Sequence, residues 1–145
     1  MRSTRGRLAA LVHAVAPGYE LERVDAARAT QWASEAGNEG AFESFRSIDD
    51  FLERGVGFCL VRDARIVSVA LSTARSLRAI DIEIVTVPDH RRRGLATVVG
   101  ARLIAQCLEL GIEPCWLAAS PASERLARRL GYVGGDRYET MVLDG

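Results

Sequence analysis

The sequence contains no lysine, and all 19 of its basic side chains are arginines. They are matched by 19 aspartates and glutamates, so the formal net charge is zero. Proteins that bind nucleic acids usually carry an excess of positive charge, and the neutral balance therefore argues against a nucleic-acid partner. Any cationic contact with a ligand must come from arginine.

Metal-binding side chains and cysteines are also scarce. The chain has two histidines and three cysteines, Cys59, Cys107 and Cys115, without a paired spacing. This pattern predicts no metal site and a reducing, cytoplasmic setting, with the thiols of Cys59 and Cys115 as inert core groups. No apolar run approaches the roughly 20 residues of a membrane span, so no membrane partner is expected.

Apolar periodicity and breaker residues predict the secondary structure. Helices are predicted over residues 7–15, 25–36, 47–52, 94–110 and 121–130. Strands are predicted over 19–24, 57–61, 66–74, 80–84, 115–119 and 136–143. Alternation along 80–84 stops at Ile84-Val85, where a bulge or a change of burial is expected. The order of elements predicts a mixed α/β (α+β) layer architecture.

The stretch from Val87 to Ala96 joins a predicted strand to the long helix and contains Arg91-Arg92-Arg93-Gly94-Leu95-Ala96. The first backbone N–H groups of a helix are unpaired, and the helix dipole is positive there. Gly94 and Ala96 let a ligand approach the backbone, and the arginines add positive charge. The stretch therefore predicts a phosphate or pyrophosphate site, although it is neither a Walker loop nor a G-x-G-x-x-G fingerprint.

Arg91-x-x-Gly94-x-Ala96 resembles the Q/R-x-x-G-x-G/A pattern of the GNAT (Gcn5-related) N-acetyltransferases. The predicted strand–loop–helix–strand–helix–strand order from Asp81 to Val142, with Leu130-Gly131-Tyr132 ending the second helix, is similar to that family. Phe51–Cys59 resembles the branch that includes zwittermicin A resistance-like acetyltransferases. The resemblance covers residues 45–143. It implies a central mixed, mostly antiparallel sheet flanked by helices, in a single domain over 19–145 that follows a basic extension or short helix over 1–18.

The resemblance also implies acetyl-CoA as the acyl-donor cosubstrate, without a metal. The backbone of the strand end would pair with the pantetheine arm, and the amides from Arg92 to Thr97 would hold the pyrophosphate. The expected cofactor contacts are Val85, Thr86, Val87, Arg91, Arg92, Arg93, Gly94, Leu95, Ala96, Thr97, Ser120 and Ser123.

Acetyl transfer to a primary amine by direct attack in a ternary complex needs a base and a proton for the leaving thiolate. Asp81 and Glu83 share one strand face before the cofactor site, and Glu83 is the first choice for the base. The same alternation would also place both on a solvated face.

Ala127 stands where many resembling proteins carry the tyrosine proposed as the acid, and Tyr132 or Tyr138 is a candidate substitute. The alternative is a non-catalytic acyl-CoA-binding or regulatory module. The acceptor is expected to be a small-molecule amine, with Phe42 and Phe45 as one option for its pocket. Amino sugars, aminopolyol antibiotics, polyamines, amino acids and protein N-termini all stay open as acceptors, and a homodimer is one possible assembly.

Overall fold

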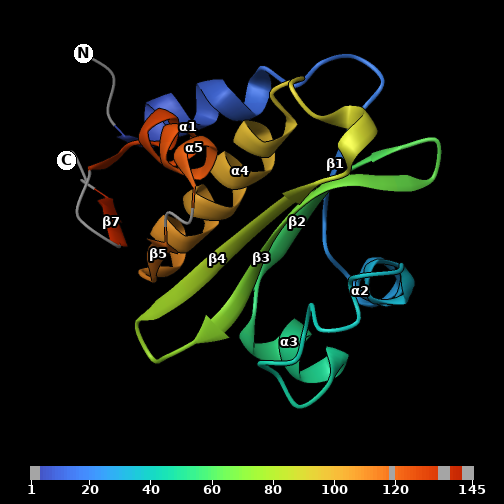
Figure 1. Ribbon diagram of the computed structural model, residues 1–145. Coiled ribbons are helices and arrows are strands. Elements are labelled where there is room, and N and C mark those ends of the chain that lie inside the picture. The colour runs from blue at the N-terminus through green and yellow to red at the C-terminus, as the bar shows by residue number, and fades with distance from the viewer. Residues whose placement is uncertain (1–3, 118–119, 134–137, 142–145) are drawn as a thin grey trace.

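The computed structural model describes residues 4–117, 120–133 and 138–141 of the chain (Figure 1). Its elements, in chain order, are α1 (Thr4–His13), β1 (Glu20–Arg23), α2 (Ala26–Ser34), α3 (Ile48–Arg54), β2 (Gly57–Arg62), β3 (Arg65–Arg75), β4 (Ala79–Thr86), the 3-10 helix η1 (Pro88–His90), α4 (Leu95–Leu110), β5 (Glu113–Leu117), α5 (Pro121–Leu130), β6 (Tyr132–Val133) and β7 (Tyr138–Met141).

The described strands form one sheet in the order β1-β2-β3-β4-β5-β7-β6. Neighbouring strands are antiparallel except for β4 and β5, which run parallel. Helices α1, α4 and α5 lie on one side of this sheet, and α2 and α3 lie on the other (Figure 1). The predicted mixed, mostly antiparallel sheet flanked by helices is confirmed.

Strand β4 stays with β3 along its length but leaves β5 early. It pairs with β5 only from Ala79 to Asp81, whereas its pairing with β3 continues to Thr86. One edge of β4 is therefore open from Ile82 onward. This separation of two neighbouring strands in the middle of the sheet creates the space for the candidate site.

The bulge expected at Ile84-Val85 is not there. Both residues keep regular register with β3, and the irregularity lies on β3 between Ser72 and Ala74. A change of burial does occur, because Ile84, Val85 and Thr86 are all half-buried. The alternation of burial ends here since the open edge of β4 borders a cleft.

Helix α4 lies between the two hydrophobic clusters and buries residues in each. Val99, Leu103 and Cys107 belong to the larger cluster, and Ala101 and Ile104 belong to the cluster that also buries Leu8 of α1. A Cβ atom at residue 100 would lie 2.9 Å from Ile84 Cδ1 and 3.0 Å from Leu130 Cδ1, so glycine there allows α4 to pack closely on β4 and α5.

Serine side chains cap helices α3 and α5. The Ser47 hydroxyl accepts a hydrogen bond from the Asp50 N–H, and the Ser120 hydroxyl accepts one from the Ser123 N–H. Helix α2 is capped in the same way, because the Asp25 side chain accepts a hydrogen bond from the Arg28 N–H.

Several element ends differ from the prediction. Helix α1 begins at Thr4 rather than 7, and α2 ends at Ser34 instead of continuing to 36. Strand β5 begins two residues early because the Glu113 N–H donates to the Arg78 carbonyl. Strand β6 was not predicted, and residues 118, 119, 136, 137, 142 and 143 of the predicted strands lie outside the described part of the chain.

Candidate functional site

A cleft of about 700 Å³ opens where β4 leaves β5. Its walls are the open edge of β4, the loop and first turn of α4, and one side of α5. The residues around it are Ile82, Glu83, Ile84, Val85, Thr86, His90, Arg91, Arg92, Gly94, Leu95, Ala96, Thr97, Trp116, Ser120, Ala122, Ser123, Arg125, Leu126 and Arg129. Most of the predicted cofactor contacts are in this set, and Val87 and Arg93 are not.

The backbone of β4 presents hydrogen-bonding groups to the cleft at alternate residues. The Val87 N–H donates to the Val67 carbonyl at 2.9 Å, which turns that peptide group toward β3. In an antiparallel pair the next residue, Thr86, turns its groups the opposite way, and its carbonyl accepts from Arg91 Nε at 3.1 Å. The amides of Thr86 and Ile84 therefore face the cleft, and those of Val85 and Val87 face β3.

The loop that leads into α4 is shaped by two left-handed residues. Arg92 has a φ of 64° and Gly94, the N-cap of α4, has a φ of 77°. No side chain caps the helix, so the first amides of α4 have no side-chain acceptor. A Cβ atom on Gly94 would meet nothing within 4 Å, which leaves open space in front of these donors. This is the arrangement that binds a phosphate group at a helix start.

Positive charge dominates the cleft. Arg91 and Arg92 border it from the loop, Arg125 and Arg129 border it from α5, and Glu83 is the one carboxylate among the described residues that line it. An anionic ligand with several phosphates would meet complementary charge on two sides of the cleft.

Arg93, the third arginine of the triplet, points away from the cleft and is held by Tyr19. The Tyr19 hydroxyl accepts from Arg93 at 3.1 Å and from Arg62 at 3.3 Å, and it lies 3.1 Å from His90 Nδ1. Burial alone would raise the pKa of Tyr19, but the hydrogen bonds and charges of Arg93 and Arg62 lower it. These contacts fix both ends of the loop to the start of β1.

The two carboxylates predicted as bases are placed differently. Glu83 is exposed, lines the cleft and has no hydrogen-bond or ion-pair partner among the described residues. Asp81 lies where β4 still pairs with β5 and does not line the cleft. The geometry therefore favours Glu83 over Asp81.

The predicted proton donors do not reach the cleft. Tyr132 is buried, its hydroxyl donates to the Pro114 carbonyl at 2.7 Å, and burial raises its pKa. Ala127 is buried in the core and does not border the cleft. The side chain of Tyr138 lies outside the described part of the structure.

Helix α5 instead presents Ser120 and Ser123 to the cleft. Ser120 caps α5, and the Ser123 oxygen accepts from the Trp116 indole N–H at 3.1 Å. The Ser123 hydroxyl proton remains available for another acceptor. Ala122, on the same helix, is exposed and borders the cleft.

The family model described as GNAT acetyltransferase matches residues 2–141, which is nearly the whole chain. The chain belongs to the GNAT acetyltransferase family. This agrees with the open β4 edge and the uncapped start of α4, which together form the cleft.

Individual relatives of this GNAT chain support the same assignment. It is 31% identical over 124 residues to the uncharacterized N-acetyltransferase YdfB of Bacillus subtilis, covering 83% of the chain and 47% of YdfB. The crystal structure of a GCN5-related N-acetyltransferase-like protein from Streptococcus suis matches with a TM-score of 0.84 and 28% identity, over 99% of this chain and 54% of that one. The chain thus spans about half the length of these two relatives.

A more distant structure shows the same fold with a ligand. The Salmonella typhimurium protein yncA, whose structure holds its cofactor acetyl-CoA, matches with a TM-score of 0.64 and 15% identity, over 88% of this chain and 95% of yncA.

Within the described residues of the GNAT chain, no helix is long and apolar enough to cross a membrane. The same residues contain no group of three or more side chains suited to hold a metal ion.

Proposed function

We propose that this GNAT chain transfers the acetyl group of acetyl-CoA to a primary amine by direct attack in a ternary complex. The observation that carries the proposal is one positively charged cleft in which the open edge of β4 leads into the uncapped, glycine-started helix α4. An extended, amide-bearing arm fits the strand edge, and a pyrophosphate fits the helix start.

Different residues of the cleft would bind different parts of acetyl-CoA. The amides of Thr86 and Ile84 would hold the pantetheine arm, and the first amides of α4 would hold the pyrophosphate. Arg91 and Arg92 add charge from the loop, and Ser120 and Ser123 border the arm from α5. Acetyl-CoA in the structure of the relative yncA supports this choice of donor.

In the reaction the amine nitrogen attacks the thioester carbonyl, the C–S bond breaks, and an amide and a thiolate form. Glu83, the one carboxylate among the described residues of the cleft, can take the proton from the amine, directly or through water. The amide of Thr86 or Ile84 can donate a hydrogen bond to the carbonyl oxygen as it becomes negative.

The Ser123 hydroxyl can donate a hydrogen bond to the leaving thiolate. It stabilises the negative sulfur but is too weak an acid to protonate it. The described residues around the cleft include no tyrosine, and the Ser123 proton is available because its oxygen accepts from Trp116. Arg125 and Arg129 on the same helix favour the anionic sulfur. Water in the open cleft can then supply the proton.

Two measurements test the proposal. Calorimetry should show acetyl-CoA binding that EDTA leaves unchanged, and thiol release from acetyl-CoA should appear when primary amines are added. Binding without thiol release from any amine would favour the alternative, a non-catalytic acyl-CoA-binding module. No binding at millimolar acetyl-CoA would refute both. The likeness of Phe51–Cys59 to the zwittermicin A resistance-like branch is part of the proposal, and an aminopolyol in the amine panel tests it.

A further inference from the structure

A second cavity, of about 220 Å³, lies beside the cleft, between strands β3 and β4 and the segment that joins α2 to α3. Glu83 and Val85 border both cavities. The other residues around the second cavity are Trp32, Gly37, Asn38, Gly40, Ala41, Glu43, Val69 and Leu71. A molecule in this cavity would therefore reach the same carboxylate that faces the donor cleft.

The charge of the second cavity is opposite to that of the cleft. Glu43 and Glu83 border it, and no arginine or histidine is among its described lining residues. Neither carboxylate has a hydrogen-bond or ion-pair partner from a side chain in the described ranges. Elsewhere in this arginine-rich chain, Asp50, Asp89 and Glu124 each form an ion pair with an arginine.

A buried donor points independently to a polar occupant. Trp32 is 3% exposed and borders the cavity, and its indole N–H has no acceptor among the residues that the structure describes. Buried polar groups are nearly always hydrogen-bonded, so such a donor indicates that the cavity takes a ligand or water with an acceptor atom. The Asn38 side chain adds both a donor and an acceptor at the same wall.

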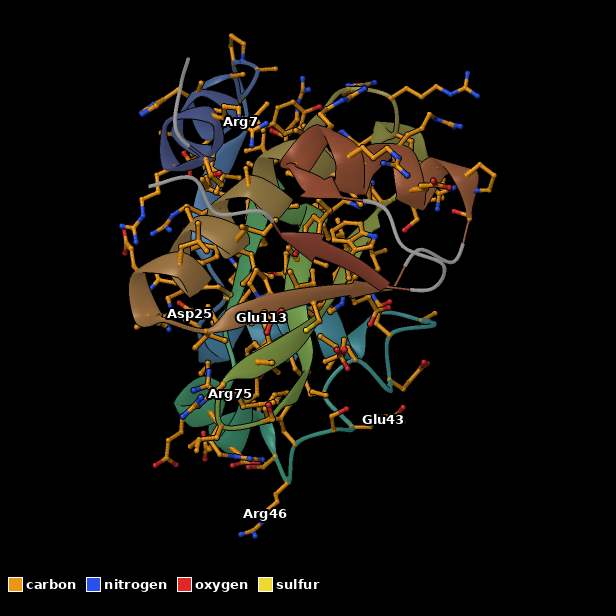
Figure 2. The ribbon with its side chains drawn as sticks, turned by 90° about the vertical axis from the view of Figure 1, so that its left-hand side faces the viewer. Arg7, Asp25, Glu43, Arg46, Arg75 and Glu113 are labelled. Atoms are coloured by element: carbon orange, nitrogen blue, oxygen red, sulfur yellow. The ribbon has the colours of Figure 1, made fainter. Side chains whose placement is uncertain are left out.

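The loop around Glu43 supplies the distal wall. Figure 2 shows Glu43 on the segment between α2 and α3, far from the helices that flank the donor cleft. Phe42 and Phe45, the two aromatics considered for an acceptor pocket, instead pack on Phe51 with ring centroids 4.7 Å and 5.3 Å away. They hold this segment in place, and Glu43 between them borders the cavity.

We infer that the acceptor is a compact amine that carries a second cationic group, as a short diamine or polyamine does. This rests on the proposed function. The reacting amine would lie at Glu83, next to the donor cleft, and the distal ammonium would lie at Glu43. A free amino acid fits poorly, because its carboxylate would be repelled by Glu43 and Glu83. A protein terminus with its neighbouring residues is too large, because a cavity of about 220 Å³ is smaller than a typical drug-sized site.

Three acceptors with the same four-carbon chain show the effect of the distal charge. Butane-1,4-diamine, butylamine and 4-aminobutanoate have a positive, a neutral and a negative distal group. We expect kcat/KM for the diamine to exceed that for butylamine by about tenfold or more, as for a charge-assisted hydrogen bond, and 4-aminobutanoate to be the poorest.

Glu43→Gln should remove the advantage of the diamine over butylamine and leave turnover of butylamine unchanged. Glu39→Gln is the matched control, because Glu39 is exposed on the same segment and does not border the cavity. Equal turnover of the three acceptors, or a charge preference that survives Glu43→Gln, would overturn the inference and leave the acetyltransferase proposal standing.

A separate binding measurement keeps the two proposals apart. If acetyl-CoA binds but no amine releases thiol, the proposed reaction is refuted. Calorimetry of butane-1,4-diamine against the CoA-bound protein then tests separately whether the second cavity binds a cation. Binding that Glu43→Gln weakens about tenfold would support a cation site. Binding that is absent, or the same in wild type and variant, would overturn it.

Discussion

Glu83 is the side chain on which the proposed chemistry depends, because it borders the donor cleft and the second cavity together. Its place follows from strand geometry. Asp81, Glu83 and Val85 share one face of β4, and only beyond Asp81 is the neighbouring strand absent. Asp81 therefore lies where β4 is paired with β5, and Glu83, two residues further along, lies where it is not.

Glu83→Gln should keep the shape of the site and remove the base. Turnover should fall by about a hundredfold or more, with acetyl-CoA affinity nearly unchanged, since lost general-base catalysis typically costs that factor. Steady-state kinetics and calorimetry on the same sample measure the two effects. Asp81→Asn is the control and should retain full activity. A loss seen only as weaker cofactor binding would give Glu83 a structural role instead.

Tyr19 is expected to position the phosphate-binding loop. Tyr19→Phe removes the acceptor shared by Arg62 and Arg93 and the contact with His90, while the ring can still pack. The KM for acetyl-CoA should rise by about tenfold, the order expected for losing hydrogen bonds to charged groups, with kcat at saturation and the melting temperature nearly unchanged. A fall in kcat at saturating acetyl-CoA, with KM unaltered, would contradict this role.

At the residue level the sequence analysis named the loop, Glu83, Ser120 and Ser123, which all border the candidate site, and missed the arginines of α5 and the contacts of Tyr19. Arg91 to Ala96 and Glu83 carry local signals, a helix start and a strand alternation. The partnership of Tyr19 with His90 and Arg93 joins positions 71 and 74 residues apart, which no local spacing reveals. The outward direction of Arg93 follows from that distant partner.

At the level of elements, α4 connects the proposed binding of the donor to the packing of the core. Its first turn carries the unpaired amides, and its middle packs on β4 and α5 at Gly100. Both ends are glycines in the left-handed region, Gly94 at φ 77° and Gly111 at φ 70°. This symmetry offers an internal control for mutagenesis.

Gly94→Glu should abolish acetyl-CoA binding in a protein that still folds, because the side chain would occupy the open space before the amides and add negative charge. Gly111→Glu is the matched control. It imposes a similar backbone strain in equally open space at the far end of α4, and binding should persist. Calorimetry and circular dichroism on both variants measure binding and folding. Acetyl-CoA binding of wild-type strength by folded Gly94→Glu would rule out this loop as the site.

The element predictions succeeded where caps and periodicity agree and failed where tertiary pairing decides. Helices α3 and α5, which Ser47 and Ser120 cap, and helix α4, which ends at Gly111, were all predicted. Strand β6 has two residues and exists only through its pairing with β7, so it has no periodicity to detect. The change at Ile84-Val85 reflected the loss of a neighbouring strand rather than a bulge.

At the level of the whole molecule, zero net charge hides a separation of charge between two adjoining cavities. The cleft is bordered by four arginines and the second cavity by two glutamates, with Glu83 common to both. A polyanionic donor and a cationic acceptor would thus each meet complementary charge. This separation of charge could not be predicted from the sequence, because the arginines come from two segments and the glutamates from two others.

The free energy of unfolding should fall as pH rises above about 9. Burial raises the pKa of Cys59 and of Cys107 to about 12, from 9.0 for an ordinary thiol. Above pH 9 the unfolded chain releases these protons while the folded protein keeps them, so the unfolded state binds fewer protons and is favoured. Urea unfolding at a series of pH values from 7 to 10 measures this. A Cys59→Ala/Cys107→Ala variant should show a weaker dependence, and an equal one would exclude the thiols as its cause.

The open edge of β4 has a consequence for the protein before any ligand arrives. A strand with unpaired peptide groups is a template for a further strand, and in most proteins such edges lie at the rim of a sheet, where charge or proline blocks the addition of other chains. Here the edge lies between two strands of one sheet, recessed behind the first turn of α4 and one side of α5. These walls of the cleft hinder the approach of a strand from another chain. Self-association by strand addition is thereby discouraged, and the charged side chain of Glu83 on β4 opposes it further.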